Sequence, residues 1–144
     1  MFKNILVPLH LSYKENHKKL FEGVLNVLDE DGKMTLFYVN ENLIHGSVQP
    51  ILEEAQNKSA NQLALEELQA IAKKHALPLD KVTFKIKEGV VHREILQSAQ
   101  KMKADAIVMM ATKPGLGSYF ISSTAERVIR HANCSVFVIR LTEY

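Results

Sequence analysis

The sequence predicts one α/β domain: a doubly wound, five-stranded parallel sheet with helices on both faces. Strand-like and helix-like segments alternate along all 144 residues, which is typical of parallel strands joined by right-handed helical crossovers. The strand-like segments are almost continuously apolar, so both faces of the sheet must be covered. No linker, repeat or low-complexity segment divides the chain, and its length suits a single domain over residues 1–144.

The first part of the chain alternates in the order strand, helix, strand. Residues 3–8 (KNILVP) form a short apolar run that a proline ends, which predicts a buried strand. Ser12 and Glu15 have the spacing of a capping box and predict the start of a helix. The acidic segment 29–32 (DEDG) is interpreted as the solvated end of that helix. Residues 34–39 (MTLFYV) predict the second buried strand.

A polar loop at residues 40–50 then leads into a long helix. Pro50 suits the first turn of this helix, because a proline lacks the N–H that the first turn leaves unpaired. The helix is expected to end at residues 77–79 (LPL). Residues 82–87 (VTFKIK) alternate between apolar and polar side chains, which favours a strand near the edge of the sheet.

The last third of the chain repeats the same alternation. An apolar stripe over residues 95–102 predicts a helix, and residues 106–111 (AIVMMA) predict a buried strand. A further helix is expected over residues 123–131. Residues 135–141 (SVFVIRL) predict the last strand, which completes the five-stranded sheet.

Composition and charge exclude several classes of protein. A formal net charge of +2, with scattered lysines, argues against a nucleic-acid-binding face. No apolar run is long enough to cross a membrane, and the N-terminus lacks the apolar core of a secretion signal. The single cysteine, Cys134, excludes an internal disulfide framework and favours a reducing compartment. We therefore expect a cytoplasmic protein.

The functional site is expected beyond the carboxyl ends of the strands, where doubly wound sheets bind their ligands. The loop after the fourth strand carries the strongest signal. Ser122, Ser123 and Thr124 open a helix, whose free N–H groups and dipole attract an anion. The loops at this end of the sheet are residues 8–12, 39–42, 88–92 and 111–124.

Two interpretations of these hydroxyl groups remain open. Ser123 and Glu126 form a second capping box, so the hydroxyls serve the helix alone, which is the commoner use of such residues. In the other interpretation, the hydroxyls bind a phosphate group. The sequence contains no Walker motif, because no lysine follows Gly115 or Gly117 at the required position.

No catalytic or metal-binding machinery is apparent. The six histidines show no metal-ligand spacing, and no cysteine pair accompanies them. His17 and His75 lie on apolar helical stripes and are interpreted as packing residues, as is Cys134. His10 follows the first strand and is predicted to lie at the mouth of a ligand site. No carboxylate pair or Ser-His-Asp arrangement stands out, so we expect no enzyme, or at most a weak ATPase.

Several stretches of the chain resemble the universal stress protein family. Residues 2–12 (FKNILVPLHLS) resemble the family's opening ILVPVDGS, and residues 104–110 (ADAIVMM) match a later segment in order and spacing. Residues 123–139 (STAERVIRHANCSVFVI) resemble its GSVAERVLRHAxCPVLVV signature. The resemblance covers the whole chain. It implies the strand order 3-2-1-4-5 and a homodimer joined through the last strand, residues 135–141.

The resemblance also identifies where this chain departs from the ATP-binding members of the family. Those members carry the motif G-x2-G-x9-G-[S/T], whose glycines fall on Ala111, Pro114 and Ser122, while Ser123 keeps the hydroxyl. The stretch is two residues shorter, which resembles the F/G-type branch, and His10 replaces the usual aspartate. Without these glycines, backbone N–H groups approach phosphates less closely. ATP binding is therefore expected to be weak or absent, at about 100 μM or poorer.

Three hypotheses about function remain open. In the first, the chain is a dimeric stress-response regulator that binds ATP or AMP with Mg²⁺; in the second, it is a nucleotide-independent module with unknown protein partners. An enzyme such as a nucleotidyltransferase is less favoured, because His-x-Gly-His is absent after the first strand. No cofactor is therefore assigned. If a nucleotide binds, the resemblance implies contacts with Pro8, Leu9, His10, Val39, Met110, Ala111, Gly117, Ser122, Ser123 and Thr124.

Overall fold

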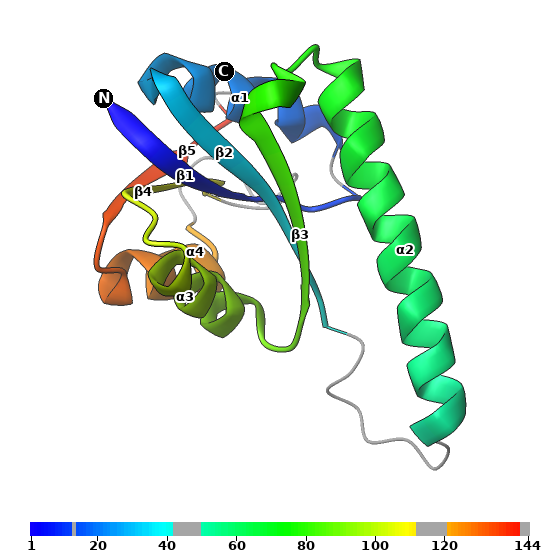
Figure 1. The fold of residues 1–144 in the computed structure, drawn as a ribbon. Helices are drawn as coiled ribbons and strands as arrows, with labels where there is room; N and C mark the ends of the chain where they lie inside the picture. The colour runs from blue at the N-terminus through cyan, green and yellow to red at the C-terminus, as the bar shows by residue number, and fades with distance from the viewer. Residues whose placement is uncertain (13, 42–49, 112–120, 142–144) are drawn as a thin grey trace.

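The fold is a parallel sheet between two layers of helices (Figure 1). The computed structural model describes residues 1–12, 14–41, 50–111 and 121–141. No helix within these ranges combines the length and the apolar character needed to cross a membrane. In chain order, the elements are β1 (Phe2–Pro8), η1 (Lys14–Asn16), α1 (His17–Val27), β2 (Leu28–Asn40), α2 (Pro50–Lys74), η2 (Leu79–Lys81), β3 (Val82–Glu88), α3 (Val91–Lys101), β4 (Ala106–Met110), α4 (Ser123–His131) and β5 (Ser135–Ile139).

The strand order is β3-β2-β1-β4-β5, and all neighbouring strands are parallel, which confirms the expected topology. β3 and β5 form the two edges, so the prediction of an edge strand over residues 82–87 is also confirmed. After β1 the chain continues to β2 on one side of the sheet, and after β4 it continues to β5 on the other side. The boundary between β1 and β4 is therefore the topological switch point.

The two central strands separate toward their carboxyl ends. β1 pairs with β4 only as far as Leu6 and Ile107. Beyond that point the N–H of Leu9 donates to β2 at 3.0 Å, whereas the N–H of Ala111 donates to β5 at 2.8 Å. The pair β1–β2 and the pair β4–β5 thus continue separately, and a crevice opens between them.

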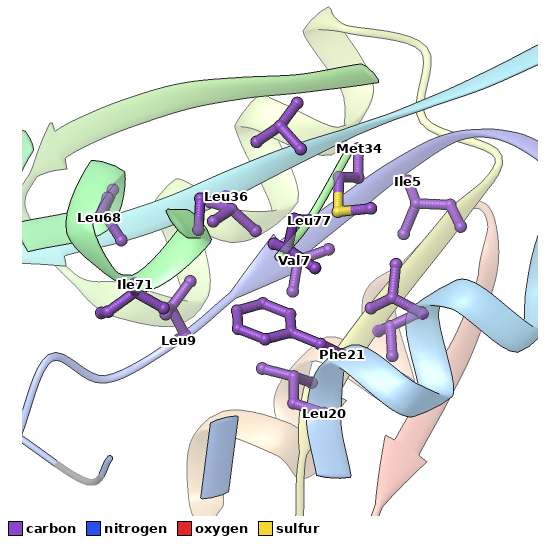
Figure 2. Packing of buried hydrophobic residues seen from close by; sticks show 14 of the residues in the cluster. Ile5, Val7, Leu9, Leu20, Phe21, Met34, Leu36, Leu68, Ile71 and Leu77 are labelled. Atoms are coloured by element: carbon purple, nitrogen blue, oxygen red, sulfur yellow. The ribbon is translucent and has the colours of Figure 1, made fainter. Parts of the chain in front are cut away.

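Alternate side chains of β1 pack into two separate cores. Ile5 and Val7 share one core with Leu20 and Phe21 of α1 and with residues of α2 (Figure 2). Leu6 belongs to the other core, which α3 and α4 cover. All three β1 side chains have no exposed surface. Burial on both faces is the reason why Ile5, Leu6 and Val7 are apolar without alternation.

The start of α1 differs from the prediction. The helix begins at His17, after the short 3-10 turn η1, and its N-cap is Asn16. Ser12 is exposed and lies outside the helix, so the predicted helix start at Ser12 is wrong, while its capping box with Glu15 stays a prediction. The side chain of Glu15 lies outside the described residues.

The end of α1 also differs, because residues 29–32 belong to β2 and not to a helix end. The register between β1 and β2 shifts after Phe2, which lets the start of β2 run beside the start of β1. Gly32 permits this close approach. A Cβ atom at this position would lie 3.0 Å from the carbonyl oxygens of Asp29 and Phe2.

The remaining predicted elements are confirmed with small differences at their ends. β3 extends to Glu88, β4 ends at Met110, and β5 ends at Ile139. The predicted loop at residues 40–50 falls mostly outside the described residues. α4 spans Ser123–His131 as predicted.

Candidate functional site

A cavity of about 130 Å³ opens where β1 separates from β4, at the carboxyl ends of the strands. This is the position at which open α/β sheets bind their ligands. Most of the predicted site residues line it. They come from the ends of β1, β2 and β4 and from the first turn of α4: Pro8, Leu9, His10, Val39, Met110 and Thr124.

The structure places the predicted site residues in different environments. His10 is exposed and lines the cavity, whereas Leu9 and Val39 are buried in its wall. Ala111, Ser122 and Ser123 are not among the described lining residues. Ala111 and Ser122 are instead hydrogen bonded to each other beside the cavity. Gly117 lies outside the described residues, as do Pro114 and Gly115.

The start of α4 adjoins the end of β4, and Ser122 makes hydrogen bonds there with both its N–H group and its hydroxyl. The N–H of Ser122 donates to the carbonyl oxygen of Ala111 at 2.8 Å. The hydroxyl oxygen of Ser122 accepts the N–H of Ala125 at 3.1 Å, so Ser122 caps the helix. The N–H of Ala111 donates to the carbonyl oxygen of Ile139, also at 2.8 Å.

The predicted capping box of Ser123 and Glu126 is therefore wrong. Ser123 is the first helical residue and is exposed. Glu126 pairs with Arg130 at 2.9 Å, one turn further along α4. The cap lies one residue earlier because the backbone hydrogen bond between Ser122 and Ala111 determines where the helix starts.

His17 holds the loop between β1 and α1. Its Nε2 atom lies 2.8 Å from the backbone carbonyl oxygen of His10, which can only accept, so the imidazole N–H donates. His17 is 2% exposed, and its ring lies edge-on to His75, which in turn lies edge-on to Phe21. Burial lowers the pKa of His75, and nearby His17 and Lys74 lower it further. Both imidazole rings pack against aromatic neighbours as predicted, and His17 also lines the cavity.

Sequence reasoning missed a group of residues in the cavity wall. Nothing in their local pattern distinguishes them from ordinary core residues, because they come from elements that only the tertiary fold brings to this opening. They lie in η1, α1 and α3 and inside β2 and β4, whereas the predicted site residues lie in or beside the loops at the strand ends. The missed residues include Asn16, Leu20, Phe37, Ile95 and Met109.

The end of β2 adds polar groups to the same wall. Tyr38 and Glu41 both line the cavity. Partial burial raises the pKa of Tyr38, and the negative charges of Glu41 and Glu67 raise it further. Tyr38 therefore stays protonated at neutral pH, and its hydroxyl can both donate and accept a hydrogen bond.

Two observations concern the residue types that could serve metal or thiol chemistry. Among the side chains that the structure describes, no three of His, Cys, Asp or Glu gather closely enough to hold a metal ion. Cys134 is half-buried, and desolvation raises the pKa of its thiol, with a further contribution from Asp105. A raised pKa keeps the reactive thiolate scarce, which fits a packing role.

The strand order defines a doubly wound α/β protein, and its cavity lies at the switch point where such sheets bind ligands. The model of one such family, described as the Universal stress protein family, matches residues 1–140. This chain therefore belongs to the universal stress protein family, and the resemblance seen in its motifs is confirmed.

Individual relatives agree with this assignment. Universal stress protein G of Escherichia coli O157:H7 is 24% identical over 142 residues, which cover 97% of this chain and 100% of that protein. The solved structure of the hypothetical protein MJ0577 matches with a TM-score of 0.77 and 25% identity, covering 100% of this chain and 99% of the other. A universal stress protein from Arabidopsis thaliana with AMP bound has a TM-score of 0.62 and 20% identity, over 97% and 92% of the two chains. At that identity the last match shows the shared fold alone.

Proposed function

We propose that this chain is a regulatory module of the cytoplasmic stress response, which acts through dimerisation and protein partners and binds ATP weakly or not at all. The hydrogen bonding beside the cavity carries this proposal. Ala111 and Ser122 occupy two glycine positions of the ATP motif, and the N–H groups of both are already donated to carbonyl oxygens. Neither N–H group is available to a phosphate.

The loss of hydrogen-bond donors to the phosphates lowers the expected affinity for ATP. If about three charge-assisted hydrogen bonds of roughly 1.5 kcal/mol each are missing, the Kd for ATP rises by about three decades. The hydroxyl of Ser122 is also engaged, because it caps α4. We therefore expect a Kd for ATP of about 100 μM or poorer.

The cavity favours a second candidate function, which is binding of the adenosine part of a nucleotide. Its wall combines buried apolar side chains, such as Phe37 and Ile95, with polar ones, such as His10 and Glu41. This mixture is typical of small-molecule sites. The AMP bound to the Arabidopsis relative supports the candidate. In this case the chain binds the nucleoside part of the nucleotide, and the phosphates add little to the affinity.

Calorimetry on protein stripped of co-purified nucleotide tests both parts of this proposal. ATP with Mg²⁺, AMP and adenosine are titrated in parallel, and we expect similar, weak affinities for all three. An ATP affinity more than about tenfold above that of adenosine would mean that the phosphate site works. ATP retained through purification would contradict the proposal in the same way. Binding of none of the three would exclude the adenosine candidate and leave the nucleotide-independent module.

The proposed homodimer rests on the exposed edge of the sheet. β5 is an edge strand, and among the described residues it pairs with β4 alone. Its apolar side chains, including Val136 and Val138, are only half-buried. An unpaired strand edge invites pairing, and a two-fold axis beside β5 covers both edges at once. Sedimentation velocity at tens of micromolar should give the mass of a dimer, and a monomer would contradict this part of the proposal.

A further inference from the structure

Asn16 lies in the wall of the cavity with a polar atom left unpaired. The residue is 2% exposed, and its Oδ1 atom accepts no hydrogen bond from the described part of the chain. Buried carbonyl oxygens without a donor are rare in native proteins, because the hydrogen bonds lost from water are not replaced. Because Asn16 lines the cavity, its Oδ1 atom is an acceptor that a molecule bound there could use.

Helix capping does not explain Asn16. The residue stands directly before α1, where an asparagine side chain commonly accepts an N–H of the first turn. A capping residue normally has an extended backbone, whereas Asn16 is already helical, with φ −82° and ψ −20°. Asn16 is itself the last residue of the 3-10 turn η1, which accounts for this helical conformation, and its side chain makes no capping hydrogen bond.

Buried apolar side chains line the cavity together with Asn16. Leu20, Phe37 and Ile95 line the same cavity and have no exposed surface. Next to Asn16, the hydrogen bond from His17 to the carbonyl oxygen of His10 holds this part of the chain in place. A carboxamide beside apolar walls offers an acceptor and a donor in one plane.

We propose that Asn16 selects the adenine base in this cavity, with Oδ1 accepting a hydrogen bond from the exocyclic amino group. The inference rests on the adenosine-binding candidate given above. An asparagine amide pairs with the amino group and an adjacent ring nitrogen of adenine, as asparagine does at adenine edges in DNA. A nucleoside without the amino group leaves Oδ1 unpaired, as it is in the free protein.

A pair of nucleosides tests the inference on the unmodified protein. Adenosine and purine riboside differ only in the amino group, and ligand-observed NMR measures both affinities into the millimolar range. We expect adenosine to bind about tenfold more tightly. Equal affinities would overturn the role of Asn16 and leave the adenosine candidate intact. If neither nucleoside binds, the adenosine candidate fails and this inference fails with it.

Two variants separate recognition from a structural role. Asn16→Leu should bring the two affinities to within about twofold, and its melting temperature should not fall, since the substitution removes an unpaired buried atom. Asn61→Leu is the matched control, because Asn61 donates to Glu88 at 2.5 Å and is not among the described lining residues. It should lower the melting temperature and keep the preference for adenosine.

A preference that survives in Asn16→Leu, with lowered stability, would identify Asn16 as a structural residue. If Asn16→Leu does not fold, the nucleoside pair on the unmodified protein still decides.

Discussion

The Nε2 atom of His17 lies 2.8 Å from the backbone carbonyl oxygen of His10, and this hydrogen bond joins the core of α1 to the loop at the cavity. The same imidazole ring meets His75 edge-on, with the ring centroids 6.2 Å apart. His75 follows directly after the end of α2. One buried side chain thus links the contact between α1 and α2 with the candidate site.

Stability should fall in mildly acidic solution. The pKa of His75 in the folded protein lies below its unfolded value of about 6.5, because burial and the nearby His17 and Lys74 disfavour the charged imidazole. Below that pH the unfolded chain binds more protons than the folded one. The free energy of unfolding should therefore be constant above about pH 7.5, fall as the pH drops through 6.5, and level off below the folded pKa. Thermal unfolding across this range measures the effect.

The variant His75→Gln should lose part of this acid dependence. His92 should also destabilise the folded protein in acid. Burial is the main cause that lowers its pKa, and the charges of Arg127, Arg93 and His131 lower it further. His92→Gln is therefore the comparison variant. An acid dependence that is unchanged in His75→Gln would show that protonation of His75 does not limit stability.

The cap of α4 should be assignable by substitution. Ser122→Ala removes the acceptor of the Ala125 N–H and should cost about 1 kcal/mol, whereas Ser122→Gly should cost only a few tenths. Ser123→Ala changes an exposed residue and should stay within about 0.5 kcal/mol. Urea unfolding of the three variants gives these differences. A larger loss of stability in Ser123→Ala than in Ser122→Ala would show that Ser123, and not Ser122, caps α4.

The imidazole of His10 should matter little for stability. The hydrogen bond to His17 uses the backbone carbonyl of His10, which the variant His10→Ala retains, so the free energy of unfolding should change by less than about 0.5 kcal/mol. His17→Ala removes the donor together with a buried ring and should cost about 2 kcal/mol or more. Any nucleotide that binds should bind more weakly to His10→Ala. A large loss of stability in His10→Ala would contradict its position at the mouth of the cavity.

Asp105 should stabilise the opposite, amino-terminal end of the sheet. Its carboxylate accepts the backbone N–H of Lys3 at 2.8 Å and that of Asn4 at 2.9 Å, which ties β1 to the start of β4. Asp105→Ala should cost about 1–2 kcal/mol, because both N–H groups return to water. Asp31→Ala, at an exposed position of β2, is the control and should be nearly neutral. Equal unfolding midpoints for the two variants would show that the Asp105 contacts add nothing.

Much of the fold could be predicted from local patterns. The apolar runs at residues 3–8 and 106–111 indicated strands buried on both faces, since no one-sided sheet needs such a run. The motif at residues 123–139 located α4 and β5, and the rule that ligands bind at strand ends led to the cavity through Pro8, His10 and Val39. These features depend on neighbours close in the sequence or on a general property of parallel sheets.

The sequence by itself determined the layers, the strands and the edge of the sheet where the site lies, because apolar periodicity records which surfaces are buried. Only the tertiary structure decided the details that depend on distant backbone. Residues 29–32 became part of β2 because Gly32 lies against the carbonyl oxygen of Phe2. Ser122, and not Ser123, caps α4 because its N–H is bonded to Ala111 of the preceding strand. Asn16 entered the cavity wall because the turn before α1 left its side chain without a capping role, and no local pattern records such a position.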